Sequence, residues 1–285
     1  DQTVLTLPYG DVDVAALLRG DFAETYERAI ELSVRLMDGL GLDATPVVAP
    51  ADGLFPNLAL DKLDPGITLL LSERAVAADA TKVRLRQGTE AVLTSDVARV
   101  GGPTPTPPFD ALALRQRILG EAAVHGLTGE DRPLVVSVPE QWDPGEDWRA
   151  ASFFEGLDVP WIRQVDVPFA QAISKPVDHD GQLTYSRAVR RREIPVANIL
   201  AAQELDAAGT ALANLLTRND TVDEEVGGAA MLGASTNARR RPDRARLMTR
   251  RISEEVHGRL GQVYVESSAL VTMSSETGNF SVTVV

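Results

Sequence analysis

Short apolar runs separated by amphipathic stretches fill the first half of the chain. The runs cover residues 4–7, 45–50 ("TPVVAP"), 67–72 ("ITLLLS") and 133–139 ("PLVVSVP"). Runs of this length between turn residues are typical of buried parallel strands. Residues 81–96 instead alternate around Gly88, which indicates a hairpin or two short strands.

Helical patterns lie between and after these runs. One helix should begin at a capping box formed by Asp21 and Glu24. Two long helices are predicted in the second half, one from near Pro195 and one over residues 242–260. Strands that alternate with helices predict an α/β fold whose parallel sheet is open or closed into a barrel. The last residues, 266–285, alternate again and indicate the first strands of a further β domain.

Composition and charge exclude several kinds of ligand and of metal site. The net charge of −13 repels phosphate backbones, so binding to nucleic acid is not expected. The absence of cysteine excludes disulfides and thiolate metal sites. The three histidines are far apart in sequence, and neither a zinc-binding spacing nor a glycine-rich phosphate loop occurs. We therefore expect no metal and no cofactor.

Carboxylates that follow the predicted strands are the candidate catalytic residues. They are Asp11 and Asp13 after the first run, Asp52 after the second, and Glu140 after the fourth. Glu73 after the third run and Asp143 close to Glu140 are further carboxylates at such ends. The carboxyl ends of parallel strands converge on the face that binds ligands, and glycoside hydrolysis needs two carboxyl groups there. Each also has a structural interpretation. Asp11 is a good helix N-cap, whereas Asp52 and Glu140 adjoin turns.

Two aromatic side chains, Tyr9 and Trp142, lie near the same predicted strand ends. They are candidate ligand-binding residues because aromatic rings stack on sugars. The alternative is that they pack over the ends of the sheet. Two basic segments, residues 187–193 and 238–251, have a similar pair of interpretations. They could face an anion, an acidic polymer or a membrane surface, or they could be solvated helix faces paired with surplus carboxylates.

Six segments resemble, in the same order, those of one family of actinobacterial cell-envelope proteins, whose genes typically lie beside that of the lipid II flippase. The segments are "TLPYGDVDVAAL", "APADG", "SVPEQWDP", "DVPWIRQV", "STNARR" and "ALVTMSSETGNFSVTV". The similarity covers nearly the whole chain. Two tryptophans common in that family are absent here, one at the position of Ala49 and one near Asn237.

The resemblance implies a fold and a location. Family members are exported, carry a barrel-like α/β region similar to glycoside hydrolases and polysaccharide deacetylases, and end in a β-sandwich and a membrane helix. By this resemblance, residues 1–265 form an N-terminally incomplete, partial (β/α) barrel with long C-terminal helices. Residues 266–285 begin the sandwich, and the full-length protein is extracytoplasmic and membrane-anchored through segments absent from this chain.

The expected function is binding of a glycan, a cell-wall precursor or a membrane protein of cell-wall synthesis, without established catalysis. One alternative is an active glycoside hydrolase that uses Asp11 or Asp13 with Asp52 or Glu140. Another is a non-catalytic scaffold for the membrane machinery of cell-wall synthesis.

Overall fold

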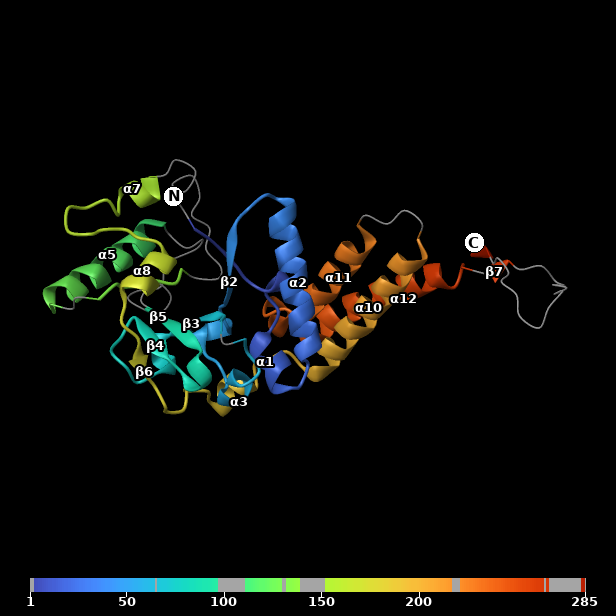
Figure 1. Cartoon of the computed structure of the whole chain (residues 1–285), viewed down its shortest axis with the longest axis horizontal. Coiled ribbons are helices and arrows are strands. Elements are labelled where there is room, and N and C mark those ends of the chain that lie inside the picture. Colours follow the sequence, from blue (N-terminus) through green and yellow to red (C-terminus); the bar gives the residue numbers. More distant parts are fainter. Residues whose placement is uncertain are drawn as a thin grey trace, which may run out of the picture. The chain divides into compact units, whose positions relative to one another are not determined.

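The computed structural model describes residues 3–64, 66–96, 111–129, 132–138, 152–216, 221–263, 265–266 and 283–284 (Figure 1). The chain divides into two compact units. The sheet unit consists of Asp1–Pro8 and Val34–Arg191, and the helical unit consists of Tyr9–Ser33 and Arg192–Val285. Glu140 and Trp142, as well as the proline-rich segment 101–109, lie outside the described residues.

The sheet unit is built on a six-stranded sheet in the order β1-β2-β3-β5-β4-β6. Its strands are β1 Val4–Thr6, β2 Ala44–Val48, β3 Thr68–Ser72, β4 Lys82–Arg84, β5 Glu90–Thr94 and β6 Val177–Asp178. β1, β2, β3 and β5 pair in parallel, whereas β4 is antiparallel to β5. The predicted α/β class, the first three strands and the hairpin are therefore confirmed.

Closure of this sheet into a barrel is not observed. β1 and β6 are its opposite edges, and no pairing among the described strands joins them. The antiparallel β4 also interrupts the repeated β-then-α pattern that a parallel barrel requires. The predicted strand at 133–139 is reduced to one bridge, between Val136 and Ser95. The described strands therefore form an open, mostly parallel sheet.

Helices of the sheet unit are mostly short. They are α3 Asn57–Leu60, α5 Ala111–Leu127, α7 Ser152–Glu155, α8 Val167–Ile173 and α9 Arg187–Arg190. Single 3-10 turns occupy Ala51–Gly53, Glu73–Ala75 and Arg86–Gly88. α5 and α7 share a small apolar core in which Leu114, Phe153 and Leu157 are buried. Ile118 and Leu119 of α5 and Val136 also pack against this core.

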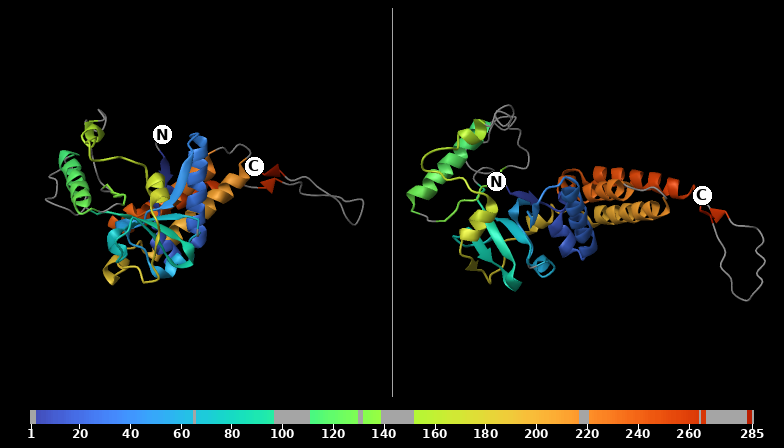
Figure 2. Two further views of the ribbon diagram at one scale, coloured as in Figure 1. Left: turned by 60° about the vertical axis from the view of Figure 1, so that its left-hand side comes forward. Right: turned by 45° about the horizontal axis from the view of Figure 1, so that its top comes forward.

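The helical unit contains α1 Val14–Arg19, α10 Val196–Leu215, α11 Val222–Gly233 and α12 Pro242–Leu260. α2 Ala23–Gly39 begins in this unit, and the boundary between the units falls within it. The right-hand view of Figure 2 shows α10 and α12 running alongside each other. The predicted helices near Pro195 and over 242–260 are confirmed, but α11 was not predicted.

Glycines permit the close approach of these helices. A Cβ added to Gly209 of α10 would overlap Val226 of α11, and one added to Gly233 would overlap Thr249 of α12. Ion pairs of Arg28 also connect three of the helices. Arg28 of α2 pairs with Asp206 of α10 at 3.3 Å and with Asp223 of α11 at 2.7 Å. Burial nevertheless raises the pKa of Asp206 above its usual value.

The end of the chain forms one short antiparallel pair, β7 Val265–Glu266 with β8 Thr283–Val284. This pair agrees with the strands predicted from the alternation of apolar and polar residues near the end of the chain. The β-sandwich stays a prediction. None of the helices in the described part of the chain is both long enough and apolar enough to cross a membrane.

Candidate functional site

Asp13 is a buried structural carboxylate of the helical unit. It is fully buried and caps α1 by accepting a hydrogen bond from the backbone N–H of Ala16 at 3.1 Å. The same carboxylate accepts from the backbone N–H of Ile194 at 2.8 Å and from two nitrogens of Arg239, with Nε at 2.6 Å. An ionised carboxylate can accept about four hydrogen bonds, and these four bonds use all of them. Asp13 therefore has no free lone pair for a substrate or an attacking water.

Asp11 occupies a turn, and the expectation that it caps the helix is wrong. It ends the 3-10 turn Tyr9–Asp11 with a φ of 49°, and its carboxylate accepts a hydrogen bond from Thr236 Oγ1. The cap position is two residues later because the chain must first leave this left-handed turn. Tyr9 packs against α11, where a Cβ added to Gly228 would lie 2.9 Å from its hydroxyl oxygen.

Asp52 belongs to the sheet unit, whereas Asp11 and Asp13 belong to the helical unit. It lies in the 3-10 turn after β2, where both Asp52 and Gly53 have a positive φ, of 60° and 64°. The turn interpretation of Asp52 is thus confirmed. The carboxylates singled out by their place after strands are not gathered within one unit.

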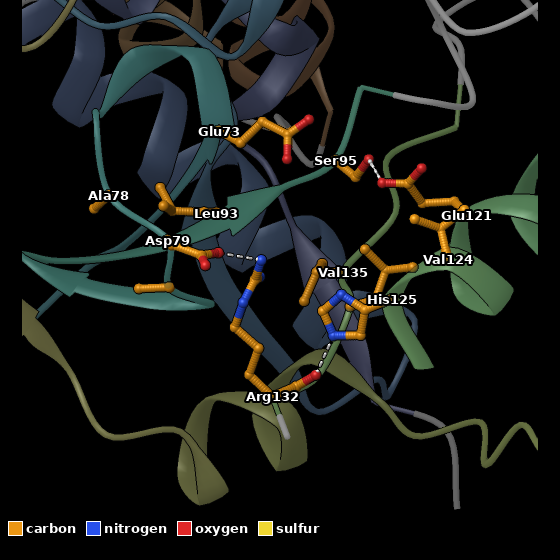
Figure 3. A pocket seen from close by; sticks show the side chains of 12 residues that line it. Glu73, Ala78, Asp79, Leu93, Ser95, Glu121, Val124, His125, Arg132 and Val135 are labelled. Atoms are coloured by element: carbon orange, nitrogen blue, oxygen red, sulfur yellow. Dashed lines mark hydrogen bonds and ion pairs between the residues drawn. The ribbon is translucent and has the colours of Figure 1, made fainter. Parts of the chain in front are cut away.

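A polar cavity lies at the carboxyl ends of β3 and β5 in the sheet unit (Figure 3). Its volume is about 230 Å³. The polar and charged side chains that line it are Glu73, Asp79, Ser95, Glu121, His125 and Arg132. This is the position at which open α/β sheets bind ligands, because side chains after neighbouring parallel strands converge there.

Local structure places each of these side chains. Glu73 opens the 3-10 turn after β3, and Ser95 directly follows β5. Glu121 and His125 are four residues apart on α5, so they share one helix face. Figure 3 shows both side chains of α5 directed toward the residues of the strand ends.

Hydrogen bonds organise one side of the cavity. Ser95 Oγ donates to Glu121 at 3.4 Å, a long bond. His125 Nε2 lies 2.6 Å from the backbone oxygen of Arg132, so this nitrogen carries the proton. The guanidinium of Arg132 pairs with Asp79 at 2.5 Å. A ligand in the cavity would therefore meet carboxylates, a hydroxyl, an imidazole and a guanidinium within one enclosure.

A buried carboxylate, Asp96, connects the ends of β3 and β5 next to the cavity. Asp96 accepts a hydrogen bond from Ser72 Oγ at 2.7 Å and pairs with the guanidinium of Arg74. Its backbone N–H also lies 3.5 Å from Glu73 Oε1. Because Ser72 ends β3 and Asp96 follows β5, these bonds join the two strand ends and fix the backbone that carries Glu73.

An apolar hollow of about 490 Å³ adjoins the polar cavity. The two share His125, Arg132 and Leu134. The hollow is lined by Phe153, Phe154 and Trp161 among other apolar side chains, and Trp161 is 55% exposed. An exposed indole beside polar groups offers a flat surface on which a sugar ring can stack.

Sequence reasoning missed most of this site. Glu121, His125 and Arg132 were not singled out, although the spacing of the first two on a predicted helix was available as a signal. In the described part of the chain, no three histidine, aspartate or glutamate side chains are arranged to hold a metal ion. Comparison with family models, with curated proteins and with solved structures finds no match to this chain.

Proposed function

We propose that the sheet unit binds a glycan in the polar cavity at the ends of β3 and β5. The observation that carries this proposal is the polar cavity with Glu73, Ser95, Glu121 and His125 beside an apolar hollow with the exposed Trp161. Sugars present hydroxyl groups that need both acceptors and donors, and they present apolar ring faces that stack on indole. The carboxylates favour a neutral or amino sugar over a phosphorylated one.

The resemblance of the sequence to actinobacterial cell-envelope proteins supports the same proposal. It would make the glycan part of the cell wall and the full-length protein extracytoplasmic and membrane-anchored. The partial (β/α) barrel and the following β-sandwich belong to this proposal as well. A membrane protein of cell-wall synthesis remains the proposed partner.

A second candidate function is glycoside hydrolysis, because two carboxylates, Glu73 and Glu121, line the same cavity. The pairs expected from the sequence support it less well, since Asp13 is occupied by four hydrogen bonds. Hydrolysis requires carboxyl groups on both sides of the scissile bond, about 5–9.5 Å apart. Release of reducing ends from a bound glycan, lost in E73Q and in E121Q, would identify this activity.

Titration with N-acetylglucosamine oligomers and muropeptides tests glycan binding. We expect calorimetric binding that weakens about tenfold in W161A, because the ring face loses its stacking partner. E121Q should weaken binding by a similar factor, since a charged acceptor is replaced by a neutral one. The intrinsic tryptophan fluorescence should respond to ligand in the wild type, and the response should shrink in W161F.

E204Q serves as the matched control, because Glu204 is an exposed carboxylate of the helical unit. Its affinity for the same oligomers should equal that of the wild type. Absence of heat and of a fluorescence response at millimolar ligand would contradict the proposal. Equal loss of affinity in E204Q would assign the effect to net charge instead of the cavity.

A further inference from the structure

The segment 238–251 concentrates positive charge in an acidic chain. It contains seven arginines and one aspartate, whereas the whole chain has a net charge of −13. The structure places these residues on the 3-10 turn Asn237–Arg240, at Arg241 directly before α12, and on the first half of α12. None of them belongs to the sheet unit, so a role for this segment is independent of the proposed glycan site.

Three of the seven arginines have partners, and Arg240 is one of them. Arg239 binds the buried Asp13, and Arg246 pairs with Asp243 at 2.9 Å on its own helix. Four others are exposed and form no ion pair with any described residue; they are Arg241, Arg244, Arg250 and Arg251. For these four side chains, no carboxylate in the described part of the chain forms the ion pair that the second interpretation of this segment requires.

Apolar side chains lie among the four arginines. Leu247 is 62% exposed and Met248 is 50% exposed. The opposite face of α12 is the one that packs inward, through the buried Thr249, Ser253 and Val256. With 3.6 residues per turn, Arg244, Leu247 and Arg251 point away from that buried face. We name these six residues the arginine face: Arg241, Arg244, Leu247, Met248, Arg250 and Arg251.

The arginine face is confined to the beginning of the helix. Further along α12, Glu254 and Glu255 are exposed, and Glu255 pairs with Arg259 at 3.0 Å. His257 is also exposed, and its Nδ1 lies 2.8 Å from the backbone oxygen of Ser253. Over the first three turns of α12, positive charge without an ion-pair partner among the described residues therefore occurs together with exposed apolar side chains.

We propose that the arginine face binds the surface of an anionic membrane. The arginines would contact the phosphates of the lipid headgroups, and Leu247 and Met248 would enter the boundary between headgroups and acyl chains. Both parts are needed for interfacial binding by an amphipathic helix, because electrostatic attraction and apolar burial add. A nucleic acid would use the arginines but would leave the two apolar side chains exposed, and the overall charge of the chain opposes it.

Co-sedimentation of the full chain with lipid vesicles tests this proposal. Vesicles of phosphatidylcholine with about 30% phosphatidylglycerol should bind the protein at low salt, and pure phosphatidylcholine vesicles should not. Replacement of Arg241, Arg244, Arg250 and Arg251 by glutamine should weaken binding by up to about 600-fold, since each basic residue near the surface contributes a factor of about five. Added salt should also weaken binding of the wild type.

Two further variants decide the outcome. The control K62Q/R84Q/R86Q/K175Q removes four exposed positive charges from the sheet unit and should bind like the wild type. L247Q/M248Q keeps all charges and should bind about tenfold more weakly, because less apolar surface is buried. Glutamine suits a helix, and circular dichroism would verify that each variant is folded.

Some results would overturn the proposal. Equal loss of binding in the control variant would mean that net charge alone acts. Unchanged vesicle binding in L247Q/M248Q, together with equally tight binding to soluble polyglutamate, would identify an acidic polymer as the partner of this face. Failure to bind any vesicle would exclude the membrane surface, and it would leave the proposed glycan site unaffected.

Discussion

Replacing Asp13 by alanine should lower the free energy of unfolding of the helical unit by about 3–5 kcal/mol, because a buried ion pair loses one partner. The variant leaves Arg239 with an uncompensated charge, and the side chain of Arg239 is only 10% exposed. It also removes the cap of α1 and leaves the backbone N–H of Ile194 without its acceptor. Urea unfolding followed by circular dichroism at the helical band would measure the loss.

D11A is the matched control for this experiment. The carboxylate of Asp11 binds Thr236 in an exposed position, so its removal should cost only about 1 kcal/mol. The double variant D13A/R239A should be less destabilised than the sum of the two single variants, because it removes the orphaned charge as well. A larger effect of D11A than of D13A would mean that Asp11 is the cap and that the arrangement described for Asp13 is wrong.

The sequence predicted those parts of the fold that depend on local patterns. β2, β3 and the β4–β5 hairpin come from short apolar runs and from alternation around one glycine, which are signals within a few residues. α12 has an apolar face at helical spacing and a proline at its start, and its bounds agree with the prediction. The barrel closure depended on connections between distant strands, for which the sequence has no local signal.

The role of Asp13 illustrates what a local pattern leaves undetermined. Its partner Arg239 is 226 residues away, so only the folded chain brings the segments "PYGDVDV" and "STNARR" together. The helix pattern predicted that Asp11 is the cap, whereas the structure places Asp13 at that position. Gly10 and Asp11 have left-handed backbone conformations, so the helix begins only after Asp13.

α11 was missed because its glycines and small residues are typical of loops. In the structure these residues are explained by tertiary packing. Gly228 accommodates the ring of Tyr9, and Gly233 accommodates the side chain of Thr249 from α12. Gly227 lies beside Arg28 and Asp206, so a larger residue would also disturb the ion pair that these two side chains form between α2 and α10. Packing against neighbouring helices thus overrides a weak intrinsic propensity.

The candidate site was predictable only in its location. Glu73 follows a predicted strand, and ligands bind at such ends in α/β sheets. The other wall comes from α5 and from residues 132–138. Most of the latter belong to the run 133–139, which was expected to form a buried strand. A continuous apolar run does not by itself identify a strand. Here the run contributes one bridge through Val136 and then lines the apolar hollow with Val136 and Val138.

Replacing Gly53 by alanine should destabilise the sheet unit by about 3–4 kcal/mol, through steric overlap added to left-handed backbone strain. An added Cβ would lie 2.6 Å from the backbone nitrogen and 2.7 Å from the Cβ of Ser72. Neither atom belongs to a flexible chain end, so the end of β3 must move. Ser72 also binds Asp96, and the displacement should therefore reach Glu73 and weaken glycan binding.

G41A is a matched control, because Gly41 has a φ of 66° against 64° for Gly53. No heavy atom of the described residues lies within 4 Å of the place that a methyl group at position 41 would take. The variant should cost only the backbone strain, about 1–2 kcal/mol. Urea unfolding of G53A and G41A compares the two effects directly, and equal destabilisation would show that the left-handed conformation alone requires glycine at position 53. A larger loss in G53A, accompanied by weaker glycan binding, would show that the contact with Ser72 links the turn after β2 to the strand end that carries Glu73.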